Sequence, residues 1–264
     1  MSLNQIIFLS VSIFIAAYLI NVFYITVLYH RGLTHNALTL SRSLKKWTAA
    51  TGIWVTGIDP KAWSCMHRMH HMYSDTENDP HSPMQLGVLG VAHGQLKSYE
   101  KVLVRLIKKD PEVCRLVGDI DFEVNILNRK KLWALPYLLH ILIAVVLSMS
   151  FGHVMVGAAY YFGIMSHPVQ GWMVNSLAHK FGYRNFEISD HSRNNALVAL
   201  LVFGEGYQNN HHAYPQRARF SHRPFEFDLG YVLCVIGSWM GLLKIKKQKN
   251  LPGGAPEALT PFAY

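Results

Sequence analysis

The sequence has few cysteines and few charged side chains, and each shortage excludes a class of protein. Only three cysteines occur among 264 residues, and no CxxC pair is present, so neither a disulfide framework nor a thiolate zinc site is expected. Charged residues make up 16% of the chain, against roughly 25% in soluble domains. Because half of the residues are hydrophobic, the chain is not disordered, and an ordinary soluble enzyme is also disfavoured.

Two long stretches have no charged side chain at all. Residues 1–30 contain no Lys, Arg, Asp or Glu, and residues 6–28 are apolar almost throughout, which suffices for one membrane span of about 20 residues. A cleaved signal peptide is the competing interpretation, but its basic start and small-residue cleavage site are missing. Residues 132–179 are also uncharged and can form two spans that turn near Gly152. We therefore predict three transmembrane helices, at about residues 6–28, 132–150 and 153–174.

The remainder of the chain is predicted to form a helical cap on one side of the membrane. The cap comprises residues 30–131 and 180–250, so residues 1–264 form a single all-α integral membrane domain. Two shorter apolar runs, at residues 196–203 and 229–243, are too brief to cross a bilayer and are expected to be helices of the cap. A charged, helix-like segment is interrupted at Asp110 and Pro111, and residues 251–264 are expected to be a loose end.

Basic residues predict the orientation in the membrane. They follow the first predicted span, precede the second and follow the third, whereas the chain start and the turn near Gly152 have none. By the positive-inside rule the amino terminus lies outside and the cap lies in the cytoplasm, at the inner membrane if the cell is bacterial. The formal net charge of +9 suits an anionic membrane surface better than nucleic acid, so no nucleic-acid partner is expected.

Fifteen histidines are present, and eight of them are clustered. His67, His70 and His71 have the i, i+3, i+4 spacing that places three side chains on one side of a helix. A second run repeats this spacing with an amide in its first position, Gln208, and Asn175 lies four residues before another histidine. The clustered histidines, all expected at the cytoplasmic face, are His30, His35, His67, His70, His71, His179, His211 and His212.

This clustering favours a site for two metal ions. Neutral imidazole is a good ligand for iron, copper or zinc, and a single tetrahedral zinc would use only about four ligands. Acidic residues can orient imidazoles through their second nitrogen, and the candidates near the clusters are Asp75, Glu77, Asp79 and Glu205. The other histidines are expected to be structural; among them, His81 is expected in a turn and His167 within a span.

The clusters resemble the histidine boxes of the membrane-bound fatty acyl desaturases, specifically the acyl-CoA delta-9 (stearoyl-CoA-type) branch. The similarity extends from about Tyr29 to Lys247. Residues 30–35 resemble the first box, residues 67–71 the second, and residues 204–212 the third. Residues 175–184 resemble the stretch that carries a further histidine ligand and a water-holding asparagine.

The resemblance implies two Fe ions and the consumption of O2 and two electrons for each double bond formed in an acyl chain. One iron is expected to be held by His30, His35, His67, His71 and His212. The other is expected to be held by His70, His179 and His211, with Asn175 acting through a water.

The resemblance also implies partners for this chemistry. The substrate is expected to be a fatty acyl chain, with acyl-CoA as the first choice, drawn from or near membrane lipid. Electrons must come from a separate ferredoxin-, rubredoxin- or cytochrome b5-like protein, because no haem, flavin or iron–sulfur motif is present. Candidate contacts for an acidic donor are Lys61, Arg68, Arg217, Arg219 and Arg223.

The chain departs from the family pattern at two places. Gln208 replaces the histidine that usually opens the third box, and because an amide is a weaker iron ligand, weaker binding of the second metal is predicted. Ser64, Cys65 and Met66 occupy positions at which some members hold the CoA head, which leaves CoA, carrier protein and lipid as alternative acyl carriers. Trp63 matches a family tryptophan near the acyl tunnel and is a candidate substrate contact. The alternative functions are a lipid or aldehyde hydroxylase with the same metals and a non-enzymatic membrane metal carrier.

Overall fold

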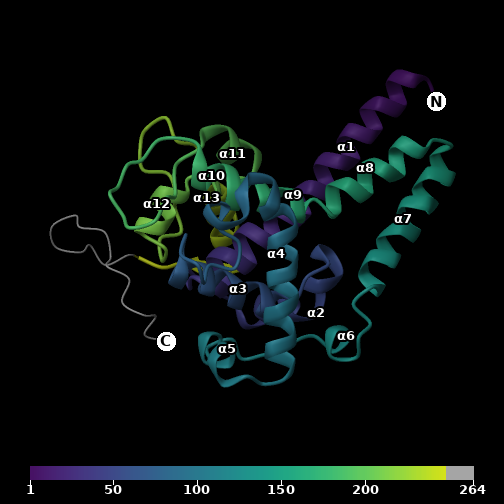
Figure 1. Ribbon diagram of the computed structural model, residues 1–264. Coiled ribbons are helices and arrows are strands. Elements are labelled where there is room, and N and C mark those ends of the chain that lie inside the picture. Colours follow the sequence, from purple (N-terminus) through teal and green to yellow (C-terminus); the bar gives the residue numbers. More distant parts are fainter. Residues whose placement is uncertain (248–264) are drawn as a thin grey trace.

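The structure, a computed structural model, describes residues 1–247, and its regular secondary structure is almost entirely helical (Figure 1). The end of the predicted cap and the expected loose end at residues 251–264 lie outside the described residues. In chain order the helices are α1 (Leu3–Val22), η1 (Phe23–Thr34), α2 (Arg42–Thr56), α3 (Pro60–Tyr73), α4 (Pro83–Ile107), α5 (Pro111–Leu116), α6 (Ile126–Arg129), α7 (Leu135–Phe151), α8 (Val154–Ile164), α9 (His167–Trp172), η2 (Met173–Leu177), α10 (Ala178–Lys180), α11 (Ala196–Leu201), α12 (Gln208–Ala213) and α13 (Leu229–Trp239). The segments η1 and η2 are π-helical.

One helix of the described chain is long and apolar enough to cross a membrane. It consists of α1 continued by η1, over residues Leu3–Thr34. The predicted second and third spans correspond to shorter helices: α7 has 17 residues and α8 has 11. The third stretch is divided because the chain leaves the helix at Met165 and Ser166, and α9 then begins at His167 with Pro168 in its first turn. Length and composition therefore support the first span, and the second and third remain predictions.

Helices α1, α7 and α8 extend together from the cap, with α8 beside α1 (Figure 1). The backbones of α1 and α8 approach closely at Gly163, where a Cβ atom would lie 2.7 Å from the carbonyl oxygen of Phe14. The turn between α7 and α8 occurs at Gly152, as predicted, with a left-handed φ of 67°. Large apolar side chains on this projection are exposed, including Phe8 and Phe162, which is the pattern expected of a surface in contact with lipid.

The cap surrounds η1 with the remaining helices. The hydrophobic cluster with the most buried residues in the described chain is built on η1, where Val27, Leu28 and Tyr29 are fully buried. Helix α3, which carries the second histidine cluster, begins where the Asp59 carboxylate accepts the backbone N–H groups of Lys61 and Ala62. The predicted interruption at Asp110 and Pro111 is confirmed, since it separates α4 from α5.

A small sheet adds to the predicted all-α fold. Strands β1 (Leu38–Leu40) and β2 (Leu243–Ile245) pair antiparallel, with Leu38 opposite Ile245. Each strand is only three residues long, too short for an alternating pattern to identify it. The pairing attaches the end of the described chain to the segment that follows His35.

Candidate metal centre

Five buried histidines from three segments form the first group of candidate metal ligands. One nitrogen from each lies within 4.8 Å of those of the others, and the members are His30, His35, His67, His71 and His211. The Nε2 atom of His71 is 3.0 Å from the Nε2 atoms of both His67 and His211, and His211 is 3.0 Å from His30 in the same way. A neutral imidazole has a single N–H, so a bound cation satisfies these crowded lone pairs better than hydrogen bonds among them.

The π-helical backbone of η1 explains why the first two ligands are five residues apart. In a π-helix the backbone hydrogen bond joins residue i to residue i+5, and the N–H of His35 donates to the carbonyl of His30 at 3.1 Å. The two rings consequently lie near each other, with centroids 4.9 Å apart. In an α-helix, residues five apart would point in different directions.

A second group of three histidines lies beside the first. It consists of His70, His179 and His212, all buried and within the same 4.8 Å limit. Helix α3 supplies ligands to both groups, because His70 joins the second while His67 and His71 join the first. The rings of His71 and His212 are 4.3 Å apart, so the two groups adjoin.

Each histidine of the second group is held by its own carboxylate. The Nδ1 atoms of His70, His179 and His212 lie 2.9, 3.3 and 2.8 Å from oxygens of Asp79, Asp75 and Asp190, respectively. In all three rings the Nε2 atom is buried and has no hydrogen-bond partner. A carboxylate on one nitrogen and a free lone pair on the other is the arrangement of a metal-ligating histidine. The donor set therefore fits a metal ion at each group, and imidazole donors suit iron.

The first group has less negative charge around it. Its one carboxylate is Glu205, which lies 2.5 Å from His30 Nδ1 and 2.6 Å from the guanidinium of Arg31. Burial, reinforced by the neighbouring imidazoles, lowers the pKa values of His35, His67, His71 and His211 well below their ordinary value. These side chains are accordingly neutral, which is the state that binds a metal.

The carboxylates of the second group are ionised. Burial by itself would raise the pKa of Asp190, but the facing His212 lowers it below its ordinary value. In the same way His179 lowers the pKa of Asp75, and His70 lowers that of Asp79. Three negative charges thus stand behind three imidazoles and can compensate the charge of a cation.

The expected division of the last histidine pair is wrong. His211 lies with the first group and His212 with the second, the reverse of the expectation. The pair sits on the short helix α12, where consecutive residues point about 100° apart. The rotation of α12 against the rest of the cap decides which histidine of the pair faces each group. The spacing of residues in the sequence does not predict that rotation.

Of the four predicted acidic partners, three contact a clustered histidine and one does not. Glu77 is exposed, whereas Asp75, Asp79 and Glu205 make the contacts described above. The sequence reasoning missed Asp190. No regular spacing in the sequence links Asp190 to His212. The one local signal is the Ser192 hydroxyl two residues on, which donates to the Asp190 carboxylate in a turn.

His81 is more than a turn residue. Its backbone N–H donates to Asp79, as a turn requires, but its ring is buried, and neither ring nitrogen has a partner. The ring stacks on His70 at 4.6 Å, and the set His70, Asp79 and His81 can also hold a metal ion. Burial and the neighbouring His70 lower the pKa of His81 to about 3.

The two amide candidates and Trp63 are all near the centre. Gln208 is buried, and its side-chain amide donates to the carbonyl of Glu205. Asn175 donates to the side-chain oxygen of Gln95 at 3.3 Å. Trp63 lies parallel to the ring of His67 at 5.1 Å, a contact that fixes this ligand against an apolar surface.

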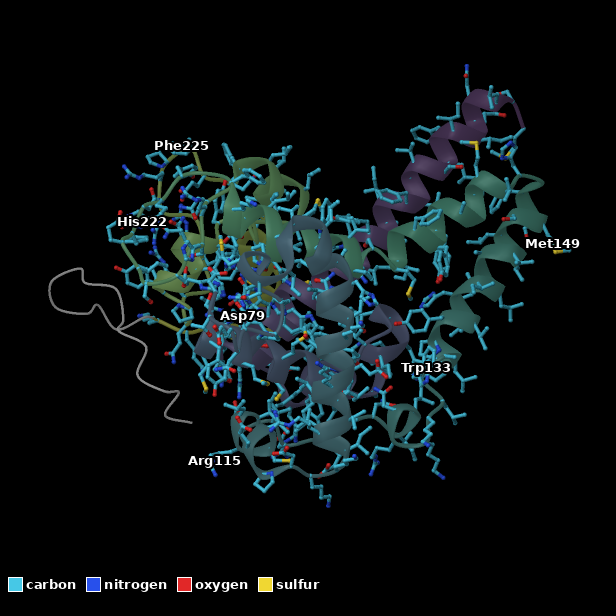
Figure 2. The ribbon with its side chains drawn as sticks, in the orientation of Figure 1. Asp79, Arg115, Trp133, Met149, His222 and Phe225 are labelled. Atoms are coloured by element: carbon cyan, nitrogen blue, oxygen red, sulfur yellow. The ribbon has the colours of Figure 1, made fainter. Side chains whose placement is uncertain are left out.

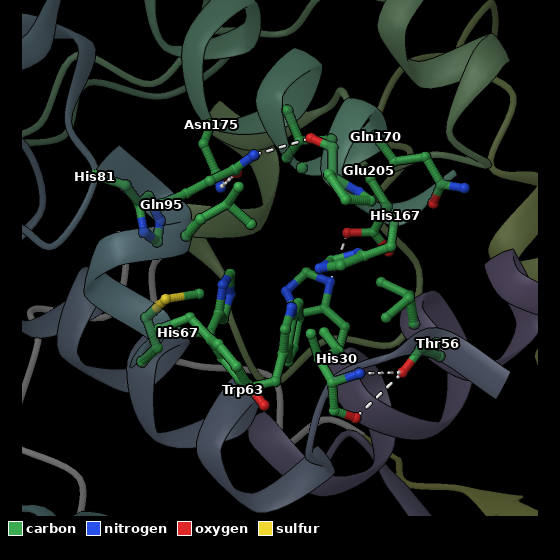
Figure 3. Close-up of a pocket in the computed structure, with 18 of the residues that line it drawn as sticks. His30, Thr56, Trp63, His67, His81, Gln95, His167, Gln170, Asn175 and Glu205 are labelled. Atoms are coloured by element: carbon green, nitrogen blue, oxygen red, sulfur yellow. Dashed lines mark hydrogen bonds and ion pairs between the residues drawn. The ribbon is translucent and has the colours of Figure 1, made fainter. Parts of the chain in front are cut away.

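A mostly apolar cavity, partly open to the surroundings, reaches the first group. Figure 3 shows His30, His67 and Trp63 on one part of its wall and His167 and Gln170 on another. Apolar residues complete the wall, among them Ile25, Ile58 and Val174. Figure 2 places Asp79 in the cap and Met149 at the tip of the α7–α8 projection. The candidate metal centre therefore lies in the cap, with an apolar space next to it.

One expected surface contact is excluded. Arg68 is fully buried, and its guanidinium donates to Asp119 and to the carbonyls of Thr34 and Leu33. It therefore holds the segment around the first box and cannot meet another protein. Arg219 and Arg223 are exposed, as such a contact requires.

Comparison with known proteins agrees with this geometry. The fatty acid desaturase family matches residues 6–227 of the chain. The chain belongs to the fatty acid desaturase family. It is 32% identical over 220 residues to the sn-1 stearoyl-lipid 9-desaturase of Anabaena variabilis. The aligned region covers 83% of this chain and 76% of that desaturase.

Plant desaturases are similar as well. The icosanoyl-CoA 5-desaturase of Limnanthes douglasii is 33% identical over 78% of this chain and 55% of its own length. The acyl-CoA 5-desaturase AL21 of Anemone leveillei is 29% identical over 84% of this chain and 66% of its own length. The chain thus spans only about two thirds or less of these two plant desaturases, and the relatives include both acyl-CoA and acyl-lipid desaturases.

Proposed function

We propose that the chain is a fatty acyl desaturase that inserts a cis double bond, delta-9-like in position, into a saturated acyl chain at a histidine-ligated di-iron centre. The observation that carries the proposal is the division of eight buried histidines into two adjoining groups whose ring nitrogens converge. The proposed ligands are these eight histidines, with Asn175 acting through a water and Gln208 as a further candidate. The whole chain is proposed to act as one domain.

The reaction balances with O2 and two electrons. Two neighbouring methylene groups each lose one hydrogen, and O2 takes up these two hydrogens together with two electrons and two protons, giving two molecules of water. Bound iron would supply the oxidising power, which no amino-acid side chain has. The residues of the chain position the ligands, keep the imidazoles neutral and surround the substrate with an apolar wall that excludes water.

The cavity beside the first group supports a hydrocarbon substrate. Trp63 lines it and also stacks on His67, so a chain in contact with Trp63 would pass close to the first group. Acyl-CoA is the carrier that the sequence resemblance favours. The three positions before the second box are Ser64, Cys65 and Met66, which are uncharged and buried. The phosphates of CoA would therefore have to be recognised elsewhere on the chain.

Partners and location form part of the proposal. Electrons would come from a separate ferredoxin-, rubredoxin- or cytochrome b5-like protein, attracted by exposed arginines such as Arg219 and Arg223. The chain would be an integral membrane protein with its cap in the cytoplasm, at the inner membrane in a bacterium. Apolar side chains exposed on α1, α7 and α8 support the membrane location.

The decisive experiment is expression in a host that lacks unsaturated fatty acids, followed by lipid profiling and by assays of purified protein. Purified protein should contain about two irons and should produce monounsaturated chains from saturated ones with O2 and a competent reductase. Hydroxylated product would instead support the lipid or aldehyde hydroxylase, and metal binding without O2 consumption would support the metal carrier. Either result, obtained with CoA, carrier-protein and lipid substrates, would overturn the proposal.

A further inference from the structure

His167 places an unpaired polar group in the wall of the apolar cavity. It is the first residue of α9, at the break between α8 and α9, and it lines the cavity (Figure 3). Its Nδ1 atom is buried and has no hydrogen-bond partner. The break itself explains this position, because the chain leaves the helix at Met165 and Ser166 and turns the His167 ring toward the cavity.

Most other polar side chains around the cavity are already paired. Glu205 holds His30 and Arg31, Gln95 donates to the carbonyl of Pro168, and Tyr137 donates to that of Gly57. Gln170 is only 2% exposed and donates to Asn21 and Ser166, while its own Oε1 atom has no partner. Apart from His81, which packs on the second group, the unpaired groups of the wall are therefore concentrated at the start of α9.

An all-hydrocarbon occupant cannot satisfy these groups. A buried polar group left without a partner costs about 1–3 kcal/mol, and a neutral imidazole always has one N–H to donate. An acyl chain has one natural acceptor for that N–H, the carbonyl oxygen of its ester or thioester. The methylene groups that follow the carbonyl then match the apolar residues of the wall.

The distance to the metal centre suits this arrangement. The His167 ring lies 6.2 Å from Trp63, which in turn lies 5.1 Å from His67, so the two histidine rings are at most about 11 Å apart. An extended chain advances roughly 1.2 Å per bond, as the polypeptide backbone does. A carbonyl at His167 would thus place carbons up to about nine bonds away beside the first group.

We propose that His167 donates a hydrogen bond to the carbonyl oxygen of the acyl substrate and thereby determines which carbons lie at the metal centre. The inference rests on the proposed desaturase function and adds a specificity-determining residue to it. It concerns the carbonyl, which CoA, carrier-protein and lipid substrates share. Gln170, held by Asn21 and Ser166, keeps the start of α9 in place beside this contact.

The test compares the double-bond position made by three variants with that made by the unchanged protein, on whichever carrier the unchanged protein uses. His167→Phe retains a ring but removes both nitrogens, and we expect a KM about three to ten times higher, the loss of one neutral hydrogen bond, with the double bond spread over several positions. His167→Gln retains a donor and should keep one dominant position. Val169→Leu is the matched control, because Val169 is on the same helix but exposed. Its product should be unchanged.

A second measurement needs no variant. An alkyl ether or thioether analogue of the substrate lacks the carbonyl, and the unchanged protein should desaturate it with the same higher KM and loss of positional control. If His167→Phe and the analogue both give the normal position and KM, the inference is wrong, and the group at His167 is satisfied by water alone. If His167→Phe does not fold, the analogue decides. Absence of any desaturation by the unchanged protein would instead refute the proposed function.

Discussion

The Nδ1 atom of His212 lies 2.8 Å from a carboxylate oxygen of Asp190, while its Nε2 atom is buried without a partner beside His70 and His179. The two residues are 22 positions apart, and the loop that carries Asp190 has no regular structure around it. This contact completes a set of three histidine–carboxylate pairs around one candidate metal. It also identifies a residue that the histidine clusters alone did not reveal.

Asp190→Asn should weaken metal binding at the second group. The substitution removes the charge that orients His212, and loss of such a partner commonly lowers metal affinity about 10- to 100-fold. Iron content after dialysis against a chelator should fall from about two toward one per chain. Asp121→Asn is the control, because Asp121 pairs with Lys45 at the surface. Equal iron retention by both variants would show that Asp190 does not support a metal.

His70→Ala should abolish desaturation and remove the second metal. His70 belongs to the second group and also contacts His81 and Asp79, so its loss removes one of the three imidazoles of that group. The apolar helices make no use of His70, and the protein should still be recovered from the membrane fraction. His93→Ala, at an exposed position of α4, should retain both iron and activity. Full activity of His70→Ala would contradict the assignment.

Gln208→His should raise iron content or turnover. An imidazole is a better iron ligand than an amide, and the α12 position already brings residue 208 into the buried centre. The measurement is iron per chain together with the rate at limiting iron. Gln216→His provides a control outside the centre, since Gln216 is exposed. If the natural protein already holds two irons firmly, the predicted weakness of its second site is wrong.

Metal-free protein should lose stability as the pH falls below about 6.5. The pKa values of His35, His67 and His71 are lowered in the fold, whereas in the unfolded chain these side chains take up protons near their ordinary pKa of about 6.5. Below that pH the unfolded state binds more protons, so the free energy of unfolding decreases, while above it these groups contribute no pH dependence. His70 has the opposite effect on the free energy of unfolding, because Asp79 raises its pKa against the opposing effect of burial. It is a single residue, so the histidines with a lowered pKa outweigh it.

The corresponding measurement is the Tm of chelator-treated protein in detergent between pH 7.5 and 5. His35→Phe removes one of the lowered groups and should make the decline shallower. His93→Phe, at the exposed position, should leave the decline as it is. A Tm that does not change over this range would mean that the histidines protonate within the fold.

Trp63→Phe should raise KM several-fold while leaving iron content unchanged. Trp63 lines the cavity and stacks on His67, and an aromatic contact of this kind contributes about 0.5–1.5 kcal/mol beyond the area it buries. Trp133→Phe is the control, because Trp133 is 60% exposed at the start of the α7 projection. Loss of iron without a change in KM would assign Trp63 to ligand support rather than to substrate.

The sequence by itself determined the eight clustered histidines of the centre and the segments that carry them. The i, i+3, i+4 spacing in His67–His71 is a property of a single helix, and α3 presents these rings as predicted. Local spacing is reliable here because the geometry of one helical turn is nearly constant. The interruption at Pro111 and the turn at Gly152 were predictable for the same reason, since proline and glycine act through their own backbone.

Only the tertiary structure decided how these elements are combined. The assignment of His211 and His212 to opposite groups follows from the rotation of α12, and the meeting of Asp190 with His212 follows from the path of an irregular loop. The break between α8 and α9, which turns His167 toward the cavity, divides an apolar stretch that the sequence predicts to be one span. Each of these depends on packing between segments far apart in the chain, and a pattern confined to neighbouring residues carries no information about that packing.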